Sequence, residues 1–387
     1  MAVSLLRFLC RAGANDDGMA RPKYLHICTC PYNHGMTFLS LRARSVLATL
    51  GKMAVSLIIL LTALWGALAL WYQLSGGTAA QGIGALLWGA LGVASIALWW
   101  MRGDARVLLP YAAGFILLLV WWSLIAPKQQ RVWADDVARN VTGTVKGNLV
   151  TLDNVRNFDW RSDDDYTVKW EQRSYDLDEL RTVDTALSYW TGPYIAHTLI
   201  SFGFADGRFL TFSIEIRKEK GESFSAIGGF FKHFEMSLIA ADERDILRVR
   251  TNARGEDMHL YRVMMPKAAM RSLFLAYLDE AQALKNQPQF YNTLTANCTT
   301  IVFEMVRRIV PGLPLDYRLM ASGYLDRYLF DVQGLVPGQT FQQLRDGGHV
   351  TARARAANGD ADFSHTIRRG MPGYDEAGYP KLQMPRQ

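Results

Sequence analysis

One cysteine of this chain stands where its thiol can act as a nucleophile. Cys298 follows Asn297 and begins a predicted helix over residues 298–310, which Pro311-Gly312 ends. Asn297 is a favourable N-cap, because its side-chain oxygen can accept a free backbone N–H of the first turn. Those N–H groups and the helix dipole favour negative charge, so they lower the pKa of a thiol placed there. The alternative interpretation is that Cys298 is a small buried hydrophobe, the common role of a lone cysteine.

A histidine that can accept the thiol proton lies on a predicted hairpin. Strands are expected over 195–204 and 209–217, and His197 lies on the first of them. A two-residue turn at Asp206-Gly207 places Glu215 on the face opposite His197. A three-residue loop over 205–207 places Glu215 directly across from it, and one over 206–208 places Arg217 there instead. The sequence leaves this register open. The chain also offers two alternative bases, His233 and His259.

A membrane anchor is predicted before these residues, over 53–126. Its uncharged apolar runs cover 54–72, 82–101 and 107–126, each close to the length that crosses a bilayer core. Basic residues lie before the first run and between the second and third, and the loop between the first and second has none. The positive-inside rule therefore predicts a multi-pass protein of a bacterial inner membrane, with its C-terminal domain in the periplasm.

The segment ahead of the anchor, residues 1–52, is expected in the cytoplasm. It holds every other cysteine and two histidines, namely Cys10, His26, Cys28, Cys30 and His34. A zinc site usually needs two matched cysteine pairs, and no second pair follows, so we predict no metal and no cofactor. An alternative for residues 1–35 is an extension of the gene model, with translation starting at Met36.

Residues 127–336 are expected to form a mixed α+β domain. Besides the hairpin, strands are predicted over 149–160, 166–173, 245–251 and 259–265. A helix with one apolar face is predicted over 266–286, and a further helical region over 313–333. Residues 337–387 are polar and are expected to form a loosely ordered C-terminal tail.

Composition excludes one class of partner. The formal net charge of +6 comes from basic residues scattered among acidic ones, without the Lys/Arg block that follows nucleic-acid phosphates. We therefore expect no nucleic-acid binding.

Several motifs resemble those of the Lnb-type N-terminal periplasmic domain family. They are Ala196-His197-Thr198, residues 213–219 and residues 291–300, with residues 154–160 similar to the family's opening strand, so the resemblance covers residues 150–335. That family is similar to circularly permuted papain-like enzymes of the NlpC and lecithin:retinol acyltransferase kind, in which the histidine strand precedes the cysteine helix. The resemblance implies a permuted papain-like α+β fold, Cys298 as nucleophile and His197 as base.

The third polar group of such a site has no assigned position, and Glu215 is our candidate for it. Asn297 and Thr299 flank the thiol at the helix start and are candidates to support an oxyanion there, together with backbone N–H groups. The roles predicted for these residues require that the fold brings separate segments of the chain together.

The working hypothesis is acyl transfer through a thioester on Cys298. The name-giving members of the family resemble lipoprotein N-acyltransferases, so membrane phospholipid and a lipoprotein are the expected partners, together with the bilayer itself. Three spans ahead of the domain distinguish this chain, so its substrate need not be the same. A periplasmic amidase or peptidase acting on peptidoglycan is the first alternative, and a non-catalytic envelope binding protein is the second.

Overall fold

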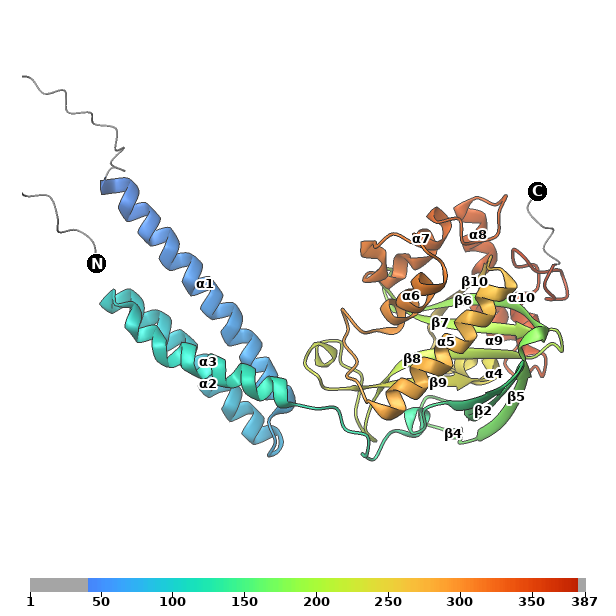
Figure 1. Ribbon diagram of the computed structural model, residues 1–387, viewed down its shortest axis with the longest axis horizontal. Helices are drawn as coiled ribbons and strands as arrows, with labels where there is room; N and C mark the ends of the chain where they lie inside the picture. Colours follow the sequence, from blue (N-terminus) through green and yellow to red (C-terminus); the bar gives the residue numbers. More distant parts are fainter. Residues whose placement is uncertain (1–40, 382–387) are drawn as a thin grey trace, which may run out of the picture. The chain divides into compact units, whose positions relative to one another are not determined.

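The computed structural model describes residues 41–381 of the chain (Figure 1). These residues divide into two compact units, of which the first ends at Val55 and contributes only the beginning of α1. The predicted cysteine and histidine cluster of residues 10–34 and the predicted start at Met36 lie outside the described residues.

Three helices at the N-terminal side are long and apolar enough to cross a membrane. They are α1 (Leu41–Gln73), α2 (Gly77–Arg102) and α3 (Leu109–Leu124), the last entered through the 3-10 turn η1 (Ala105–Leu108). The three apolar runs of the sequence fall on these helices. Aromatic side chains pack between them, for example Trp88 stacked on Tyr111 with ring centroids 5.0 Å apart.

The remaining chain is built on an eight-stranded sheet with the order β1-β2-β9-β8-β7-β6-β10, in which β5 also pairs with β2. Its strands are β1 (Thr142–Lys146), β2 (Leu149–Arg156), β5 (Trp170–Asp176), β6 (Leu180–Thr191), β7 (Ile195–Phe204), β8 (Phe209–Arg217), β9 (Glu235–Ala241) and β10 (Asp257–Val263). All neighbours are antiparallel except β2 and β9. A separate small ribbon pairs β3 (Asp159–Trp160) with β4 (Tyr166–Thr167).

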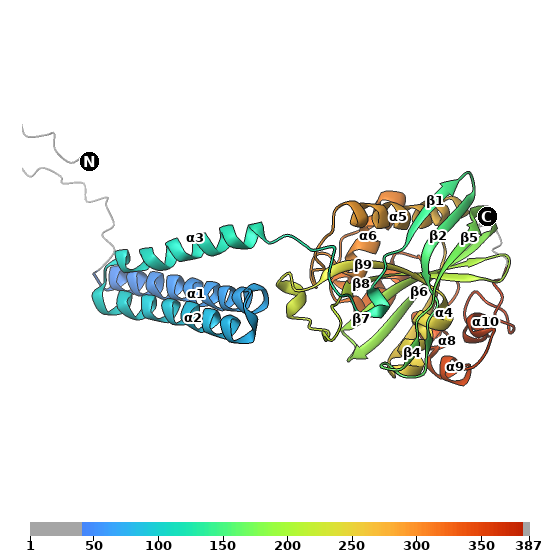
Figure 2. The same cartoon turned by 90° about the horizontal axis from the view of Figure 1, so that it is seen from below.

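Helices cover both faces of this sheet, as Figure 2 shows. Helices α5 (Lys267–Asn286) and α6 (Cys298–Ile309) lie on one side, and α4 (Glu243–Arg248), α9 (Thr351–Ala356) and α10 (Phe363–Arg368) lie on the other. The connecting elements are η2 (Asp135–Val137), η3 (Leu177–Glu179), η4 (Gly228–Phe230), η5 (Val249–Ala253), η6 (Tyr317–Leu319), η7 (Ser322–Tyr324), α7 (Leu325–Asp331) and α8 (Phe341–Gly348).

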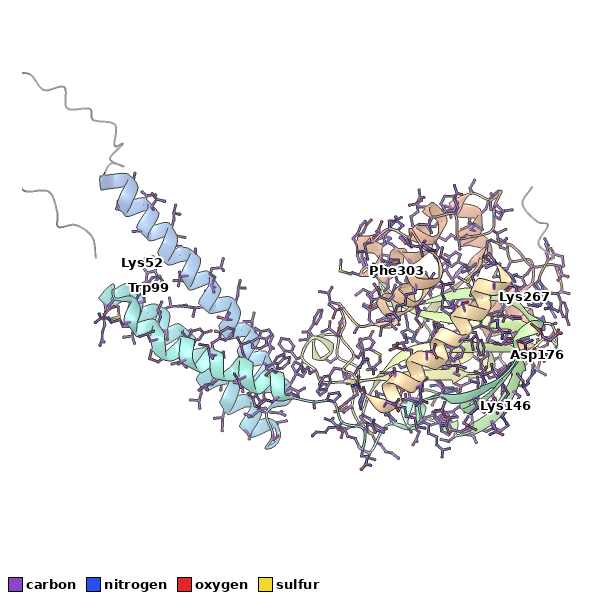
Figure 3. The ribbon with its side chains drawn as sticks, in the orientation of Figure 1. Lys52, Trp99, Lys146, Asp176, Lys267 and Phe303 are labelled. Carbon is purple, nitrogen blue, oxygen red and sulfur yellow. The ribbon has the colours of Figure 1, made fainter. Side chains whose placement is uncertain are left out.

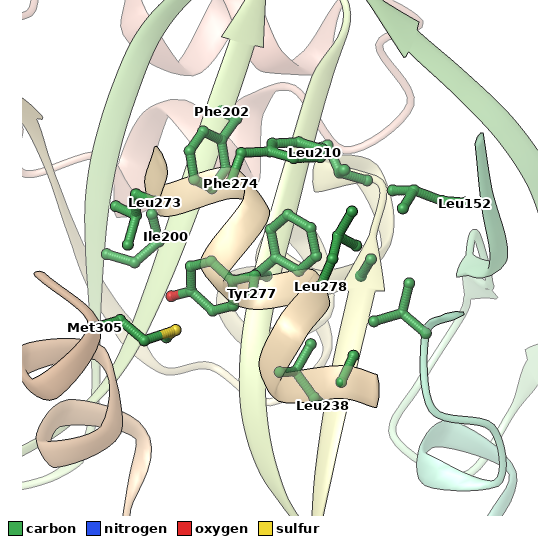
Figure 4. Close-up of a cluster of buried hydrophobic side chains, with 14 of the residues drawn as sticks. Leu152, Ile200, Phe202, Leu210, Leu238, Leu273, Phe274, Tyr277, Leu278 and Met305 are labelled. Atoms are coloured by element: carbon green, nitrogen blue, oxygen red, sulfur yellow. The ribbon is translucent and has the colours of Figure 1, made fainter. Parts of the chain in front are cut away.

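The central strand β7 is buried along its length after Ile195, because both of its faces are covered. Phe202 packs edge-on against Phe274 of α5, with ring centroids 5.1 Å apart, in the core beneath α5 (Figure 4). Leu199 points to the opposite core, where Phe363 of α10 is fully buried. Such a strand is held in one register, which fixes the position of any side chain at its end.

Helix α5 was predicted from its apolar face, and the structure has it at nearly the same bounds. It begins at Lys267, whose amine donates to the backbone oxygen of Asp178 beyond the end of β5. Figure 3 labels Lys267 of α5 and Phe303 of α6. The Phe303 ring packs edge-on near that of Tyr328. The helical region expected over 313–333 is present as η6, η7 and α7. Both strands of the predicted hairpin have the predicted bounds.

The strand predicted over residues 245–251 is wrong, because this segment forms α4 and the π-helical turn η5. Asp242 caps α4 by accepting the backbone N–H of Arg244. The carboxylate of Asp245 is fully buried, where it binds the guanidinium of Arg156 and the indole N–H of Trp160. These polar contacts fix a helical turn that an apolar alternation pattern does not reveal.

The expected loosely ordered tail is also wrong for the described residues up to 381. Helices α8, α9 and α10 fold onto the domain although their sequence is polar. The few apolar side chains of this segment are the ones that are buried, among them Val350 and Phe363. Arg368 adds a buried ion pair with Asp184 of β6 and Glu243 of α4. Residues 382–387 lie outside the description.

Candidate active site

The cap of α6 places the thiol of Cys298 at the first position of the helix. Asn297 has an extended backbone, and its side-chain oxygen accepts the N–H groups of Thr299 and Thr300, both at 2.9 Å. The Thr300 hydroxyl accepts the backbone N–H of Asn297 in return, at 2.9 Å. This reciprocal capping box sets the direction in which the helix leaves the loop. Cys298 is only 5% exposed.

The hairpin of β7 and β8 has the three-residue loop over 205–207, since Gly203 pairs with Phe209 and Leu199 with Ser213. The same register continues to the pair of His197 and Glu215. Their side chains meet, with His197 Nε2 lying 3.1 Å from Glu215 Oε1.

A serine completes the contact between the imidazole and the carboxylate. Ser213 Oγ lies 2.7 Å from His197 Nε2 and donates to Glu215 Oε1 at 2.7 Å. Nε2 of the ring is engaged in this way, and His197 and Cys298 lie close enough for each to shift the pKa of the other. The fold thus brings a thiol from α6, an imidazole from β7 and a carboxylate from β8 together.

The charges of this group favour a thiolate beside an imidazolium. Burial and the Arg250 charge lower the pKa of His197, but the Glu215 carboxylate and the Cys298 thiolate outweigh them and raise it to about 9. Burial raises the pKa of Cys298, whereas the His197 imidazolium and the Thr198 backbone N–H lower it below its usual value. Burial also opposes ionisation of Glu215, yet His197 and Arg250 hold its pKa well below the usual range.

A buried arginine holds the Glu215 carboxylate in place. Arg250 donates to Glu215 Oε1 at 2.9 Å and to Glu256 Oε2 at 3.2 Å. Glu256 in turn accepts from the hydroxyl of Ser188 on β6. Sequence reasoning missed Arg250 and Glu256 because Arg250 lies on the segment that was predicted as a strand. No local sequence pattern indicates that Arg250 binds Glu215, which is distant in the sequence.

A tyrosine lies near the thiol. The Tyr291 phenol lies close enough to Cys298 for the charge of the thiolate to act on it. Burial, with the charges of Cys298 and Glu215, raises the pKa of Tyr291 well above its usual value, so the phenol keeps its proton as a donor. Tyr291 stands at the start of the motif that carries the family resemblance, and that position is the signal that could have singled it out.

The two predicted oxyanion residues have mainly structural contacts. The Asn297 side chain is occupied by the cap and by donation to the backbone oxygen of Thr293 at 2.8 Å. The hydroxyl of Thr299 lies 2.8 Å from that of Thr198 and joins the cysteine helix to the histidine strand. Both residues flank Cys298 and hold it in place.

The two alternative bases are engaged elsewhere. His233 Nε2 lies 3.8 Å from Glu222 Oε1, and its ring packs edge-on against Phe234. His259 on β10 stacks on His349 and lies beside Asp257. His197 is therefore the histidine that the fold brings to the thiol.

Comparison with known proteins found one family model that is similar to the segment carrying this site. The model of the Lnb N-terminal periplasmic domain family matches residues 166–323, a segment that contains His197, Glu215 and Cys298. No curated protein and no solved structure matched the chain. With three helices that are long and apolar enough to cross a membrane, the match fits a membrane-anchored protein with a periplasmic domain. Residues 166–323 are thus similar to the Lnb N-terminal periplasmic domain family.

Proposed function

We propose that this protein is a cysteine acyltransferase that works through a thioester on Cys298, in a permuted papain-like domain. The observation that carries the proposal is the hold of Glu215 and Ser213 on His197 Nε2, beside a buried Cys298 whose pKa the His197 charge lowers. A thiolate beside an imidazolium attacks an ester or amide carbonyl without prior proton transfer. The same imidazolium can then protonate the leaving group.

The proposed reaction has two balanced steps. In the first, the Cys298 sulfur bonds to the carbonyl carbon of an acyl ester, the ester C–O bond breaks, and His197 gives its proton to the leaving alcohol. In the second, an amine attacks the thioester, the C–S bond breaks, and His197 takes a proton from the amine. The free thiolate and the imidazolium are restored, and the acceptor leaves as an amide.

Tyr291 is our candidate for stabilising the oxyanion of both steps. Its phenol keeps its proton and lies near Cys298. If the hydroxyl turns toward a developing oxyanion, it donates one hydrogen bond, and the Cys298 N–H at the start of α6 can donate a second. Preorganised donors of this kind are a large contribution to acyl transfer.

Exposed apolar side chains on the segments around the site support a lipid as the acyl donor. They come from the β6–β7 turn, the segment between β8 and β9, and the loop before α6, and comprise Trp190, Tyr194, Ile195, Phe224, Ile227, Phe230 and Leu294. These segments contact one another, since the Trp190 and Phe224 rings lie 6.1 Å apart and the Thr293 hydroxyl donates to the backbone of Ala226. Contiguous exposed apolar surface marks an interaction site.

The same surface is tied to the ends of the membrane helices. The side-chain amide of Gln73 at the end of α1 donates to the backbone oxygens of Phe231 and Lys232, at 2.9 and 2.7 Å. The Lys232 amine donates to the backbone oxygen of Trp122 on α3 at 2.8 Å. A phospholipid donor in the bilayer and a lipoprotein acceptor at its surface suit this attachment.

The test is a search for the acyl-enzyme. The full chain is purified into nanodiscs of phospholipid whose acyl chains are labelled. It is then digested, and the mass of the Cys298 peptide is measured by mass spectrometry. We expect a mass increase equal to one acyl group, which hydroxylamine removes and which Cys298→Ser lacks. His197→Gln should slow its formation, whereas His233→Gln, a matched change at a histidine outside the site, should not.

Two results overturn the acyltransferase. Cleavage of a muropeptide without any acyl-enzyme from phospholipid identifies an amidase or peptidase. Alkylation of Cys298 no faster than that of a free thiol, together with full complementation of a deletion by Cys298→Ser, identifies a non-catalytic envelope binding protein.

The proposal includes a place in the bacterial inner membrane, with the N-terminus in the cytoplasm. Arg102 and Arg106 flank the turn between α2 and α3, and the turn between α1 and α2 has no basic residue. Alkaline phosphatase fused after Gly76 or at the C-terminus should be active, and the same enzyme fused after Asp104 should be inactive. The reverse pattern contradicts the topology.

A further inference from the structure

A second group of polar side chains lies at the edge of the sheet, on β10. Asp257, His259 and His349 each offer one ligand atom, and these atoms all lie within 4.8 Å of one another. His349 Nε2 is 2.6 Å from one oxygen of Asp257, and His259 Nε2 is 3.6 Å from the other. The acyl-transfer mechanism uses none of these residues.

The backbone holds the three side chains on one side of the strand. Asp257 and His259 are two residues apart on β10, so their side chains point to the same face. His349 follows α8 and is joined to His259 by an isolated antiparallel bridge. The two imidazole rings are nearly parallel, with centroids 4.7 Å apart. The arrangement therefore rests on backbone pairing between segments that are distant in the sequence.

The surrounding hydrogen bonds leave the ligand atoms correctly oriented for a metal ion. His259 Nδ1 donates to the backbone oxygen of Arg345 at 3.3 Å, which leaves the lone pair on Nε2. The Thr351 hydroxyl donates to Asp257 Oδ1 at 2.7 Å and orients the carboxylate. Contacts of this kind, to the far nitrogen of a histidine and to a carboxylate, are usual around bound metals. The Arg345 guanidinium is turned to Asp326, which offsets its charge.

We propose that Asp257, His259 and His349 bind one Zn²⁺ ion. Two imidazoles and one carboxylate are ligands that zinc prefers, and ligand atoms about 3.3 Å apart fit its tetrahedral geometry. Small side-chain rotations bring the present spacing to that value. Asp257 is 53% and His349 46% exposed, so an ion can enter and water can complete the coordination.

The ion fastens the C-terminal segment to an edge of the sheet. Strand β10 is the last of the sheet order and would otherwise present free backbone groups there. The residues after α8 cover it, with the Val350 N–H donating to the backbone oxygen of Met258 at 3.0 Å. A metal that links β10 to His349 closes a long loop of the chain, so it stabilises the folded state of the C-terminal segment.

Zinc binding to the full chain in detergent tests the site. The protein is stripped with EDTA, and bound Zn²⁺ is measured by equilibrium dialysis against buffered zinc chloride. We expect His349→Ala and Asp257→Asn each to bind one ion fewer than the unaltered chain. His233→Ala removes a histidine that also lies near a carboxylate and should bind as many ions as the unaltered chain. Comparing these variants cancels any zinc held by the cysteines of residues 1–40 or by Cys298.

Thermal unfolding gives a second readout that does not involve activity. Zinc at a hundredfold excess over its dissociation constant should raise the melting temperature of the stripped chain by roughly 5 °C or more. The rise should be lost in His349→Ala, whose folding is checked by an unchanged rate of Cys298 alkylation. Equal zinc content in His349→Ala and the unaltered chain, or an equal rise of melting temperature in both, overturns the site.

Discussion

The charge of Glu215 has a measurable effect on the nucleophile. Glu215 and Cys298 raise the pKa of His197 to about 9 against burial and the Arg250 charge. In Glu215→Gln the imidazolium loses its carboxylate, so its pKa should fall toward its ordinary value of about 6.5. The thiolate then loses its counter-charge, and alkylation of Cys298 by iodoacetamide at neutral pH should slow by about tenfold or more. Mass spectrometry of the Cys298 peptide measures this rate separately from the other cysteines.

Glu222→Gln is the matched control for this prediction. It removes a carboxylate that also lies near a histidine, with Glu222 Oε1 3.8 Å from His233 Nε2. Iodoacetamide should alkylate Cys298 of the Glu222→Gln variant at the same rate as Cys298 of the unaltered chain. An unchanged rate in Glu215→Gln, or equal slowing in both variants, contradicts the role of Glu215.

The pKa of His197 also predicts a pH dependence. The imidazolium protonates the leaving alcohol, so formation of the acyl-enzyme should decline as the pH rises through about 9. The Cys298 pKa is lowered, so the thiolate persists there and alkylation should not decline. Both rates are measured on the same protein between pH 7 and pH 10. A parallel decline of the two, or no decline of acylation, contradicts His197 as the acid.

At the scale of elements, the N-cap of α6 should affect both the stability of the domain and the reactivity of Cys298. Asn297→Ala removes the acceptor of two backbone N–H groups and the contact to Thr293. The chain should lose about 1 kcal/mol of unfolding free energy, as for other N-caps. It should also alkylate Cys298 more slowly, because the thiol is no longer held against His197. Thermal unfolding and alkylation rates measure the two effects.

Helix α8 provides the control, because Thr340 forms the same kind of capping box with Gln343. Thr340→Ala should cost a similar free energy of unfolding and leave the alkylation rate of Cys298 unchanged. If both variants slow alkylation equally, the loss in Asn297→Ala reflects general destabilisation, and the cap has no specific role at the site.

The elements that local pattern determines were predictable, and those that depend on distant partners were not. The hairpin of β7 and β8 and the helix after Cys298 follow from turn, cap and periodicity signals within their own residues. The contact of Glu215 with His197 depended on one residue of loop length, which no local signal decided. Strands β6 and β9, and the helical turn that presents Arg250, depend on neighbours far along the chain.

At the scale of the whole molecule, the C-terminal segment shows how polar composition misleads. Low hydrophobicity predicts poor order because too little apolar surface is buried. Here a network of buried charged side chains holds the segment against the sheet. Arg368 and Tyr374 of this segment bind Asp184 of β6, and Arg368 also binds Glu243 of α4, beneath the face of the sheet opposite α5. The segment is thus part of the domain that carries the site.

Arg368 should therefore be essential to the folded domain. Arg368 and its partners Asp184 and Glu243 are fully buried, and the guanidinium lies 3.8 Å from the centre of the Phe209 ring. Arg368→Ala leaves two carboxylates buried without their counter-charge, which should cost about 3–5 kcal/mol of unfolding free energy. Thermal unfolding of the full chain in detergent measures the loss.

The adjacent Arg369 is exposed and gives the control, since Arg369→Ala removes the same charge from solvent. Its melting temperature should match that of the unaltered chain. If Arg368→Ala is also unaffected, the C-terminal helices are not required by the sheet. A large loss of unfolding free energy that is confined to Arg368→Ala instead means that residues 337–381 fold as part of the domain. Truncation before α8 would then remove contacts that support β6. Its neighbour β7 carries His197.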